Sequence, residues 1–563
     1  MSTTPAAPTT KPRIMLLTGG PIHDWQSCAP VLESLLAQRF DVTHTHDVAD
    51  LAHLASGKFA AVVALYTRLE LNDAQLGALE SFIKGGGGFV ALHGTAAFKE
   101  QPKLAALIGC RFATHGAILD YEVRPTIPDH PVVTRTSPFK VTDELYLVDS
   151  LTDYDTFAVA HWQGKDHPMG YERKLGKGRV IFLANGHNAQ AMSNRHVQRL
   201  IERATRVACG EKFDKTITAG VLGYGGAFNM GKQHAGAINM QSGMKVVAVC
   251  DLDPKRTEQA KVELGDQIKT TNDPAAFLAD GDFDLCVQIL PHNIHAEYCI
   301  KASQGGKHVV TEKPFCITLD EADRMLAAAR KSGTMLSAYH NRRWDNDFLA
   351  MLSIIRRGEI GQVFRIDAAS AGYGEPRTWW RSSKTISGGT MYDWGAHYCD
   401  WMLNMMNKPI ESVVGDFQKR KWHSMTNEDY TYALVRFADG TTATLEQGSL
   451  AAIGRGGWRI LGTEGGLQNA GPHQPVTFKK FDRDLGMVET KFEPKGPGTA
   501  ESYYQNVGNH LIAGEELVVK AAEARRAIGV IWLAEQSAKQ GGKPLALPGE
   551  DKYADNCNYI TPW

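Results

Sequence analysis

The side chains best suited to chemistry in this 563-residue chain lie in two short segments of its C-terminal half. Lys313 stands in a Glu-Lys-Pro tripeptide directly after the apolar run HVVT, where a buried parallel strand would end. Asp393, His397 and Asp400 are spaced i, i+4 and i+7, so on a helix they share one face. An ammonium group and a histidine with carboxylate neighbours could together handle the proton and the oxygen of a substrate hydroxyl group.

These residue types fit the oxidation of an alcohol. A histidine flanked by carboxylates can act as a general base with a raised pKa and a fixed tautomer. A lysine held by a rigid proline can stabilise a developing alkoxide. Each residue also has a plainer interpretation: Lys313 as a surface lysine, His397 as a helix-packing residue with Asp393 as a cap, or the group as a metal site with only three ligands.

A glycine-rich turn predicts where a dinucleotide cofactor would bind. The apolar run ITAGVLGYGG supplies Gly223, Gly225 and Gly226, but Phe228 stands where a strict G-x-G-x-x-G turn needs glycine, and the pattern resumes only at Gly231. Such glycines let the backbone approach a pyrophosphate at a helix N-terminus.

The end of the next strand indicates which cofactor the turn would bind. The run KVVAVCDLD ends in Asp251 and Asp253, and a carboxylate there would accept the ribose hydroxyls of NAD and repel the extra phosphate of NADP. We therefore expect NAD, with NADP second, and a solvated strand end is the plain alternative.

Two segments of the chain each look like the start of an α/β domain. RIMLLTGG and ITAGVLGYGG are both apolar runs that end in glycines, as the first strand of an α/β domain does. The first is followed by alternating strand and helix patterns, including a helix over 72–84. Beyond about residue 362, strand patterns follow one another without helices, which is typical of an antiparallel sheet covered on one face. Two helices are expected near 501–513 and 518–539.

The predicted fold class is therefore α/β in three parts. These are a flavodoxin- or amidotransferase-like parallel sheet, an NAD(P)-binding Rossmann domain, and an α+β domain with an open, antiparallel-rich sheet. The boundaries expected from the sequence are a disordered lead at 1–12 and domains at 13–212, 216–340 and 341–563.

Composition excludes several classes of function. The formal net charge of -1 argues against sequence-independent binding to nucleic acid. Because no run of 18 apolar residues occurs, we expect no membrane span, and the N-terminus lacks the apolar segment of a signal peptide. Nine cysteines without a Cys-x-x-Cys pair suggest free thiols in a reducing cytoplasm.

The C-terminal motifs together resemble the Gfo/Idh/MocA oxidoreductases. The shared features are the glycine turn with His234, the AVCDLDP strand, Pro291 with His295, Glu312-Lys313-Pro314, HNRRWD, RRGEIGQV and GGTMYDWGAHYCD, in family order. The resemblance implies that Lys313 positions substrate, that His397 is the acid/base with Asp393 as its partner, and that Pro291, His295 and Glu312 border the cofactor. This chain departs from the family pattern at two positions: Phe228 stands in place of a glycine, and Ser387 stands where a third glycine is common.

The N-terminal segment of residues 13–209 resembles the ThuA-like family, whose domains look like class I glutamine amidotransferases. The matching stretches are GGPIHDW, FIKGGGGFVALHG, DHPV, DELY and GRVIFLANGH. His93 occupies the turn where those enzymes carry a cysteine nucleophile, so glutaminase activity is not expected. His23, His93, His115 and His187 lie at strand ends or loops that would converge at one sheet edge, and they could bind zinc or a similar divalent ion. Scattered polar loop residues are the equally weighted alternative.

The sequence thus predicts an NAD-dependent oxidoreductase that oxidises a secondary hydroxyl of a sugar or glycoside to a keto-sugar. The N-terminal domain would act on or bind a related carbohydrate. The alternatives are an NAD-dependent glycosidase or lyase that oxidises its substrate transiently, and a non-catalytic sugar sensor. We expect a small-molecule partner, a cytoplasmic location, and a homo-dimer or homo-tetramer, because a sheet with one open face usually needs a second copy to cover it.

Overall fold

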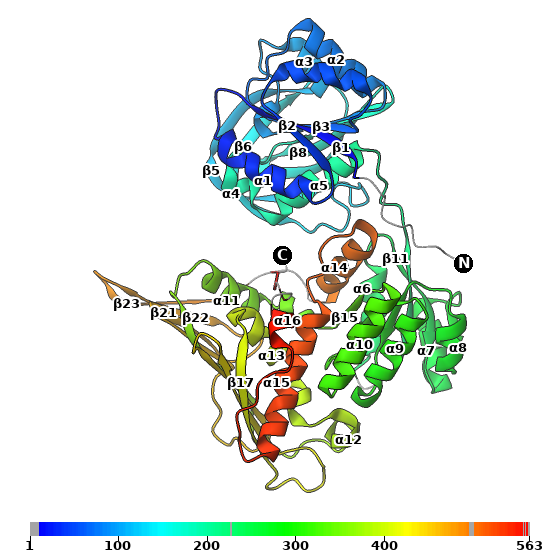
Figure 1. The fold of residues 1–563 in the computed structure, drawn as a ribbon, viewed down its shortest axis with the longest axis vertical. Coiled ribbons are helices and arrows are strands. Elements are labelled where there is room, and N and C mark those ends of the chain that lie inside the picture. The colour runs from blue at the N-terminus through cyan, green and yellow to red at the C-terminus, as the bar shows by residue number, and fades with distance from the viewer. Residues whose placement is uncertain (1–10, 226–227, 495–499, 555–556, 558, 561–563) are drawn as a thin grey trace. The chain divides into compact units, whose positions relative to one another are not determined.

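The chain folds into two compact units, Met1–Lys215 and Thr216–Trp563 (Figure 1). The structure is a computed structural model, and it describes residues 11–225, 228–494, 500–554, 557, 559 and 560. Each unit is described by itself. The sequence-predicted fold class is confirmed, because the first unit contains parallel strands, and the second contains a Rossmann-like sheet followed by an antiparallel-rich sheet.

The first unit is built on a nine-stranded sheet whose first half is parallel. Its order is β2-β1-β3-β4-β9-β8-β7-β5-β6. The parallel strands are β1 (Arg13–Gly19), β2 (Asp41–Thr45), β3 (Ala61–Tyr66), β4 (Gly88–Leu92) and β9 (Gly178–Leu183), and all of them except the edge strand β2 are almost wholly buried. The main helices of this unit are α1 (Trp25–Ala37), α2 (Asp73–Lys84), α3 (Pro102–Ile108) and α5 (Arg195–Ala208). Helix α2 begins where the sequence predicts, because Asn72 and Gln75 form a capping box.

The second half of this sheet was not anticipated from the sequence. Four antiparallel strands continue from β9, and they are β5 (Cys110–Pro125), β6 (Phe139–Ser150), β7 (Asp155–Trp162) and β8 (Lys165–Leu175). Strand β5 has mostly exposed or half-exposed residues, so it lacks the apolar run that marks a buried strand. Strand β6, the last in the order, carries residues of the site described below.

The second unit begins with a six-stranded, all-parallel sheet in the order β12-β11-β10-β13-β14-β15. Its strands are β10 (Ile217–Leu222), β11 (Met244–Cys250), β12 (Lys269–Thr271), β13 (Leu285–Gln288), β14 (His308–Thr311) and β15 (Leu336–Ala338). The helices between them are α6 (Met230–Asn239), α7 (Pro254–Leu264), α8 (Pro274–Asp280), α9 (His295–Gln304) and α10 (Leu319–Ser332). The order reverses between β10 and β13, and ligands bind at such switch points in open α/β sheets.

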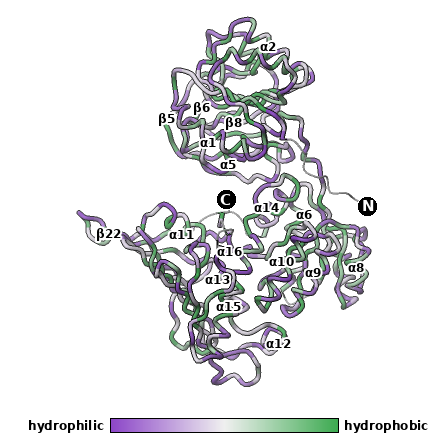
Figure 2. The backbone as a smooth tube through the Cα atoms, in the orientation of Figure 1, coloured by the Kyte–Doolittle hydropathy of each residue, from purple (hydrophilic) through white to green (hydrophobic). Residues whose placement is uncertain are grey.

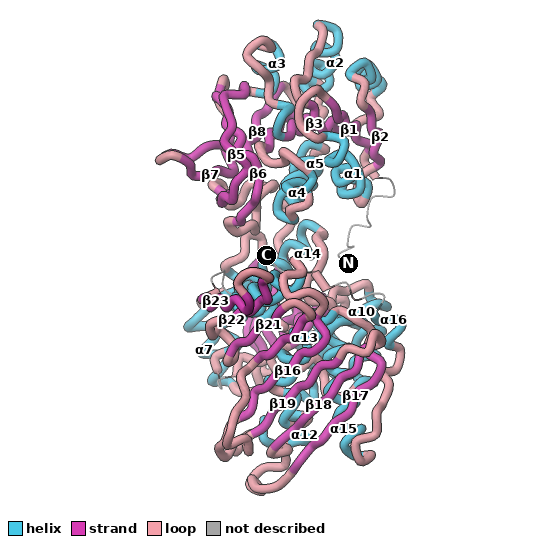
Figure 3. The backbone as a smooth tube through the Cα atoms, turned by 90° about the vertical axis from the view of Figure 1, so that its left-hand side faces the viewer, coloured by secondary structure: helices cyan, strands magenta, loops and turns pink. Residues whose placement is uncertain are grey.

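An eight-stranded sheet completes the second unit, and only its β16–β19 pair is parallel. Its strands run β16 (Val363–Ala371), β17 (Ile410–Gln418), β18 (Tyr430–Phe437), β19 (Thr442–Gly448), β20 (Trp458–Gly462), β21 (Gly465–Asn469), β22 (Val476–Asp482) and β23 (Gly486–Phe492). Figure 3 shows β16 to β19 side by side, viewed onto the face away from helix α15 (Ala521–Lys539). A Cβ added at Gly415 of β17 would lie 1.9 Å from the Ala534 carbonyl oxygen of α15, so helix and sheet pack backbone to backbone.

The opposite face of this sheet is less covered. Along β18 the buried Ala433 and Val435 alternate with half-exposed Leu434 and exposed Arg436. The remaining helices of the unit are α11 (Asn346–Arg356), α12 (Lys384–Ser387), α13 (Trp394–Met406), α14 (Ala500–Ala513) and α16 (Glu550–Ala554). A homo-oligomer that covers the open face stays a prediction.

Hydropathy and cysteines agree with the sequence-based expectations. Hydrophobic and hydrophilic residues are interspersed along both units (Figure 2). Among the described residues, no helix has both the length and the apolar character needed to cross a membrane. All nine cysteines fall within the described residues; they are free, and eight of them are buried.

Candidate functional site

A cavity of about 350 Å³ opens at the switch point of the Rossmann sheet. Gly223 and Gly225, directly after β10, form part of its wall. Gly223 has a φ of 91°, and a Cβ there would lie 2.2 Å from the Ile289 carbonyl oxygen, so only glycine fits. At Gly225 a Cβ would meet no atom within 4 Å, which leaves the backbone open to the cavity. Gly226 lies outside the described residues.

A carboxylate and the N-terminus of helix α6 border the same cavity. Asp251 follows β11 and lines the cavity, and its Oδ2 accepts a 2.7 Å hydrogen bond from the Tyr224 backbone nitrogen. Asp253 does not line it; its side chain accepts from the Lys255 nitrogen and caps α7. Of the two carboxylates proposed from the sequence, the structure therefore places Asp251 at the cavity.

Three further residues expected to bind cofactor differ in their placement. Pro291 and Glu312 line the cavity. His295 lies underneath it, fully buried, with its ring nitrogens 2.8 and 2.9 Å from the carbonyl oxygens of Pro314 and Leu290. Gly231 is also set back, because a Cβ there would lie 2.7 Å from the Tyr224 ring. His295 and Gly231 therefore lie behind the cavity wall and are not part of it.

Lys313 joins the cavity to a group of charged side chains. Its Nζ donates to Asp393 Oδ1 at 2.8 Å, and Arg381 Nη1 donates to the same oxygen at 3.0 Å. Lys313 and Arg381 both line the cavity. Although burial works in the other direction, the charges of Lys313 and Arg381 hold the pKa of Asp393 well below its usual range. Asp393 is therefore ionised and fixes the Lys313 ammonium group at the cavity edge.

His397 lies in helix α13, 5% exposed, and is not part of the cavity wall. The expectation that flanking carboxylates raise its pKa is wrong. Burial, together with the nearby charge of Lys313, lowers the pKa of His397 well below 6.5. The carboxylates serve other cations: Asp393 pairs with Lys313, and Asp400 accepts from Arg343 at 2.6 and 2.9 Å. His397 is thus a neutral imidazole close to a cation.

Sequence reasoning missed two residues of this site. His292 follows Pro291, and its Nδ1 donates to the Ser387 carbonyl at 2.8 Å while its buried Nε2 has no hydrogen-bond partner among the described residues. Arg381 stands in the RTWWRSS stretch and lines the cavity. For His292, its place beside Pro291 was the one signal in the sequence that it belongs to the site. Nothing in the sequence links residues 292 and 381 to Lys313.

Glu312 is held by a buried relay. His234 Nε2 lies 2.9 Å from Glu312 Oε1, and His234 Nδ1 lies 2.6 Å from the Tyr504 hydroxyl. The other Glu312 oxygen accepts from the Lys313 backbone nitrogen at 3.0 Å. Burial opposes ionisation, but the hydrogen bond and charge of His234 hold the pKa of Glu312 below its ordinary value. A buried carboxylate thus fixes the backbone that carries Lys313.

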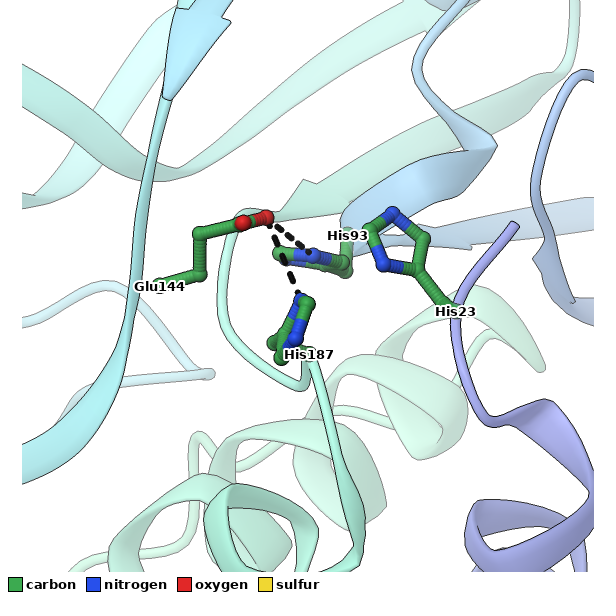
Figure 4. Close-up of side chains that lie close together, drawn as sticks. All are labelled: His23, His93, Glu144 and His187. Carbon is green, nitrogen blue, oxygen red and sulfur yellow. Dashed lines mark ion pairs between the residues drawn. The ribbon is translucent and has the colours of Figure 1, made fainter. Parts of the chain in front are cut away.

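The first unit brings three of its four singled-out histidines together (Figure 4). His23 follows β1, His93 follows β4 and His187 follows β9, so all three leave the carboxyl ends of parallel strands. Their ring centroids are 4.8 to 5.5 Å apart. Burial and the neighbouring histidines lower the pKa of His23 to about 4.

A carboxylate that the sequence reasoning had not singled out completes this group. Glu144 of β6 places Oε2 3.3 Å from His93 Nε2 and 3.2 Å from His187 Nδ1 (Figure 4). One ligand atom from each of His23, His93, Glu144 and His187 lies within 4.8 Å of the others. His115 is outside this set: it is half exposed, and its Nδ1 lies 2.8 Å from the other Glu144 oxygen. Glu144 belongs to the DELY stretch, which was the available signal.

The buried Asp143 positions the loop of His187. Its carboxylate accepts from the backbone nitrogens of Gly186 at 2.8 Å and His187 at 3.1 Å. Close packing also explains Gly94, since a Cβ there would lie 2.9 Å from the His23 ring. The cysteines of this unit, which are Cys28, Cys110 and Cys209, are not members of the group.

Three protein-family models match the chain. A trehalose-utilisation (ThuA) model matches residues 13–208. A model of the oxidoreductase family with an NAD-binding Rossmann fold matches residues 217–340, and the GFO/IDH/MocA C-terminal domain matches residues 348–468.

Named relatives resemble the second unit. The scyllo-inositol 2-dehydrogenase (NADP(+)) of Bacillus subtilis is 27% identical over 59% of this chain and 96% of that enzyme. The 1,5-anhydro-D-fructose reductase of Ensifer adhaerens is 27% identical over 46% of this chain and 78% of that enzyme. An NAD-binding protein from Listeria innocua, 24% identical, shares the fold with a TM-score of 0.53 over 60% of this chain and 98% of its own.

Proposed function

Because the second unit of this chain belongs to the Gfo/Idh/MocA family of NAD(P)-dependent oxidoreductases, and the first to the ThuA family, we propose that the protein oxidises a secondary hydroxyl of a sugar or glycoside to a ketone. One observation carries the proposal. Lys313 lines the nucleotide cavity and is also anchored by Asp393, so a hydroxyl group bound to its ammonium lies at the cofactor. Relatives named for inositols and an anhydro-sugar support a polyhydroxylated substrate.

The residues around the cavity fit a nicotinamide dinucleotide. Gly223 makes the tight turn after β10, and Gly225 leaves room for a pyrophosphate beside the N-terminus of α6. Asp251 would accept hydrogen bonds from the hydroxyls of the adenosine ribose, which favours NAD over NADP. One relative is named for NADP(+), so this carboxylate and not the family decides the preference. The bound nicotinamide supplies the acceptor for the hydride that leaves the carbinol carbon.

The chain's own groups handle the proton. His397 is neutral because its pKa is lowered, so it can take the hydroxyl proton as hydride departs. Lys313 donates a hydrogen bond to the same oxygen, and Asp393 keeps its ammonium group oriented. The charge of Arg381 adds to the positive potential at the cavity edge, which stabilises developing alkoxide.

We further propose that the first unit binds or processes a carbohydrate related to the one that the second unit oxidises. The support is that one chain carries both units, and that the first has a polar histidine group at the carboxyl edge of its sheet, where ligands of α/β sheets bind. A reactive keto-sugar made by the second unit would then be produced on the same chain as its next binding site.

Cofactor reduction over a panel of cyclitols, sugars and glycosides tests the dehydrogenase. We expect net NADH release with at least one substrate, and a loss of at least ~10²-fold in hydride transfer in Lys313→Ala and in His397→Ala. NADH affinity of the His397→Ala variant should stay unchanged, because His397 does not line the cavity. Near-normal turnover in either variant would contradict the assignment, and bond cleavage without net NADH release would indicate the redox-neutral glycosidase or lyase.

A further inference from the structure

The most unusual group outside the oxidoreductase site is the cluster of His23, His93, His187 and Glu144 in the first unit. His93 is completely buried, and its Nδ1 donates to the Ala184 carbonyl oxygen at 2.8 Å. In the neutral ring this bond leaves Nε2 with a lone pair and no proton. The Nε2 faces the Glu144 carboxylate at 3.3 Å, and neither His93 Nε2 nor Glu144 Oε2 has a hydrogen-bond partner among the described residues.

A second buried nitrogen of the cluster faces the same Glu144 oxygen. His187 Nδ1 is 3.2 Å from the same Glu144 oxygen and is likewise without a hydrogen-bond partner among the described residues. Two buried acceptors, His93 Nε2 and Glu144 Oε2, therefore face each other, and the buried His187 Nδ1 faces the same carboxylate oxygen. Buried acceptors that face each other are costly unless something positive lies between them. A single proton could satisfy only one of the two pairs.

The spacing of these atoms is the spacing of ligands around one ion. Two donors bonded at about 2.1 Å at tetrahedral or octahedral angles lie about 3.0 to 3.4 Å apart. The 3.2 and 3.3 Å separations fall in this interval. All four ligand atoms lie within 4.8 Å of one another, and two donors on opposite sides of an octahedral ion lie about 4.2 Å apart, so only a small inward movement is needed. Side chains from β6 and from the ends of three other strands thus meet with the geometry of a coordination sphere.

The groups behind the cluster also resemble the outer shell of a metal site. Ligating histidines usually donate their second nitrogen to a carbonyl or carboxylate, as His93 does to Ala184. Ligating carboxylates usually have a second partner at their other oxygen, and His115 Nδ1 lies 2.8 Å from the other oxygen of Glu144. His23 and His93 have φ angles of 67° and 42°, which are uncommon for residues other than glycine and concentrate at functional sites.

We propose that the first unit binds one divalent transition-metal ion through His23, His93 Nε2, His187 Nδ1 and Glu144 Oε2, with His115 outside the coordination sphere. Three imidazoles and one carboxylate suit Zn²⁺, Mn²⁺, Fe²⁺, Co²⁺ or Ni²⁺ and not Ca²⁺ or Mg²⁺, which take oxygen ligands. An ion with octahedral coordination would keep two positions for oxygen atoms of water or of a sugar carbonyl or hydroxyl. This site does not depend on the dehydrogenase.

Metal titration of the full-length chain tests the proposal. The purified protein is stripped with a chelator and titrated with Zn²⁺, Mn²⁺ and Co²⁺ by calorimetry, with bound metal counted by elemental analysis. We expect one ion per chain, and d–d absorption bands on Co²⁺ binding that indicate nitrogen ligands. His93→Ala and Glu144→Gln should each weaken binding by at least ~10²-fold, since loss of a ligand costs more than loss of an outer-shell partner.

Matched variants separate ligands from bystanders. His161→Ala removes an exposed histidine paired with Asp166 in the same unit and should leave metal affinity unchanged. His115→Ala should weaken binding by ~10- to 100-fold at most while keeping one ion per chain. The circular dichroism spectrum and the thermal transition of the first unit verify folding of every variant.

Two results would overturn the proposal: a stripped wild-type chain that takes up none of the three ions, or a His93→Ala chain that binds one with unchanged affinity. If His93→Ala does not fold, Glu144→Gln decides, because it keeps the shape of the side chain. Neither result touches the dehydrogenase assignment, which is read from NADH release.

Discussion

At the scale of single residues, the site of the second unit depends on which partner each charged group has. Asp393 and Asp400 look equivalent in sequence, four and three residues on either side of His397. In the structure one is committed to Lys313 and the other to Arg343. His397 is therefore surrounded by positive and not negative neighbours, and the sequence could not show this because Lys313 and Arg343 lie more than fifty residues away.

The lowered pKa of His397 has a direct kinetic consequence. Because burial and the charge of Lys313 keep the imidazole unprotonated, the base stays competent as the pH falls through 6.5. Substrate oxidation measured as kcat/KM should therefore lose activity only at pH values below 6.5, with an acid limb at the lowered pKa.

Removing one of the neighbouring positive charges should move this limb upward. Arg342→Gln deletes a charge that lowers the pKa of His397, so protonation should set in at a higher pH. Arg330→Gln, at the exposed end of α10, is the control and should leave the profile unchanged. An acid limb at or above 6.5 in the wild-type enzyme would show that His397 is not the base.

Cofactor preference should depend on Asp251. We expect NAD to bind more tightly than NADP, because the phosphate of NADP would meet this carboxylate at the cavity. Asp251→Asn should reduce the NAD-to-NADP affinity ratio by at least ~10-fold, since a repulsive charge pair is removed. Fluorescence titration with both reduced cofactors measures the ratio. Asp253→Asn, which changes only the cap of α7, should preserve it; a wild-type protein that prefers NADP would refute the role of Asp251.

At the scale of elements, local patterns predicted what local sequence determines. The glycine turns, the helix capped by Asn72 and the parallel strands of both units follow from short apolar runs and turn residues. Strands β5 to β8 were not predicted: β5 lacks an apolar run, and its pairing with β7 joins strands that are not consecutive in the chain. Glu144 was missed for the same reason: only the position of β6 in the sheet brings it to the histidines.

Arg343 shows how a buried ion pair connects elements of the second unit. Its guanidinium donates to Asp400 of α13, to Glu523 of α15 at 2.6 Å and to the Val518 carbonyl at 2.7 Å. All three charged side chains are buried. Arg343→Met should lower the free energy of unfolding of the second unit by ~3–5 kcal/mol, because two carboxylates lose their counter-ion.

Urea unfolding followed by tryptophan fluorescence measures this loss. The control is Arg324→Met, which breaks an exposed pair with Asp320 on α10 and should hardly move the transition. If both variants unfold at the same urea concentration, Arg343 does not hold α13 and α15 together.

At the scale of the whole molecule, the two units have separate hydrophobic cores. The buried apolar residues of the first unit form one cluster between Ile14 and Ala208. Those of the second form two clusters between Ile217 and Tyr559, and among the described residues each cluster belongs to one unit. A ligand that binds only one unit should therefore stabilise only that unit.

Scanning calorimetry of the intact chain tests this expectation. We expect two thermal transitions. NADH at ~100 times its dissociation constant should stabilise the second unit by ~2.7 kcal/mol and leave the other transition in place, because the nucleotide cavity is lined by residues of the second unit. A bound divalent ion should raise only the transition of the first unit. Fragments 1–215 and 216–563 assign the two transitions, since each fragment contains its complete core. A single transition that both ligands shift equally would mean that the units unfold as one, and that binding in one unit stabilises the other despite their separate cores.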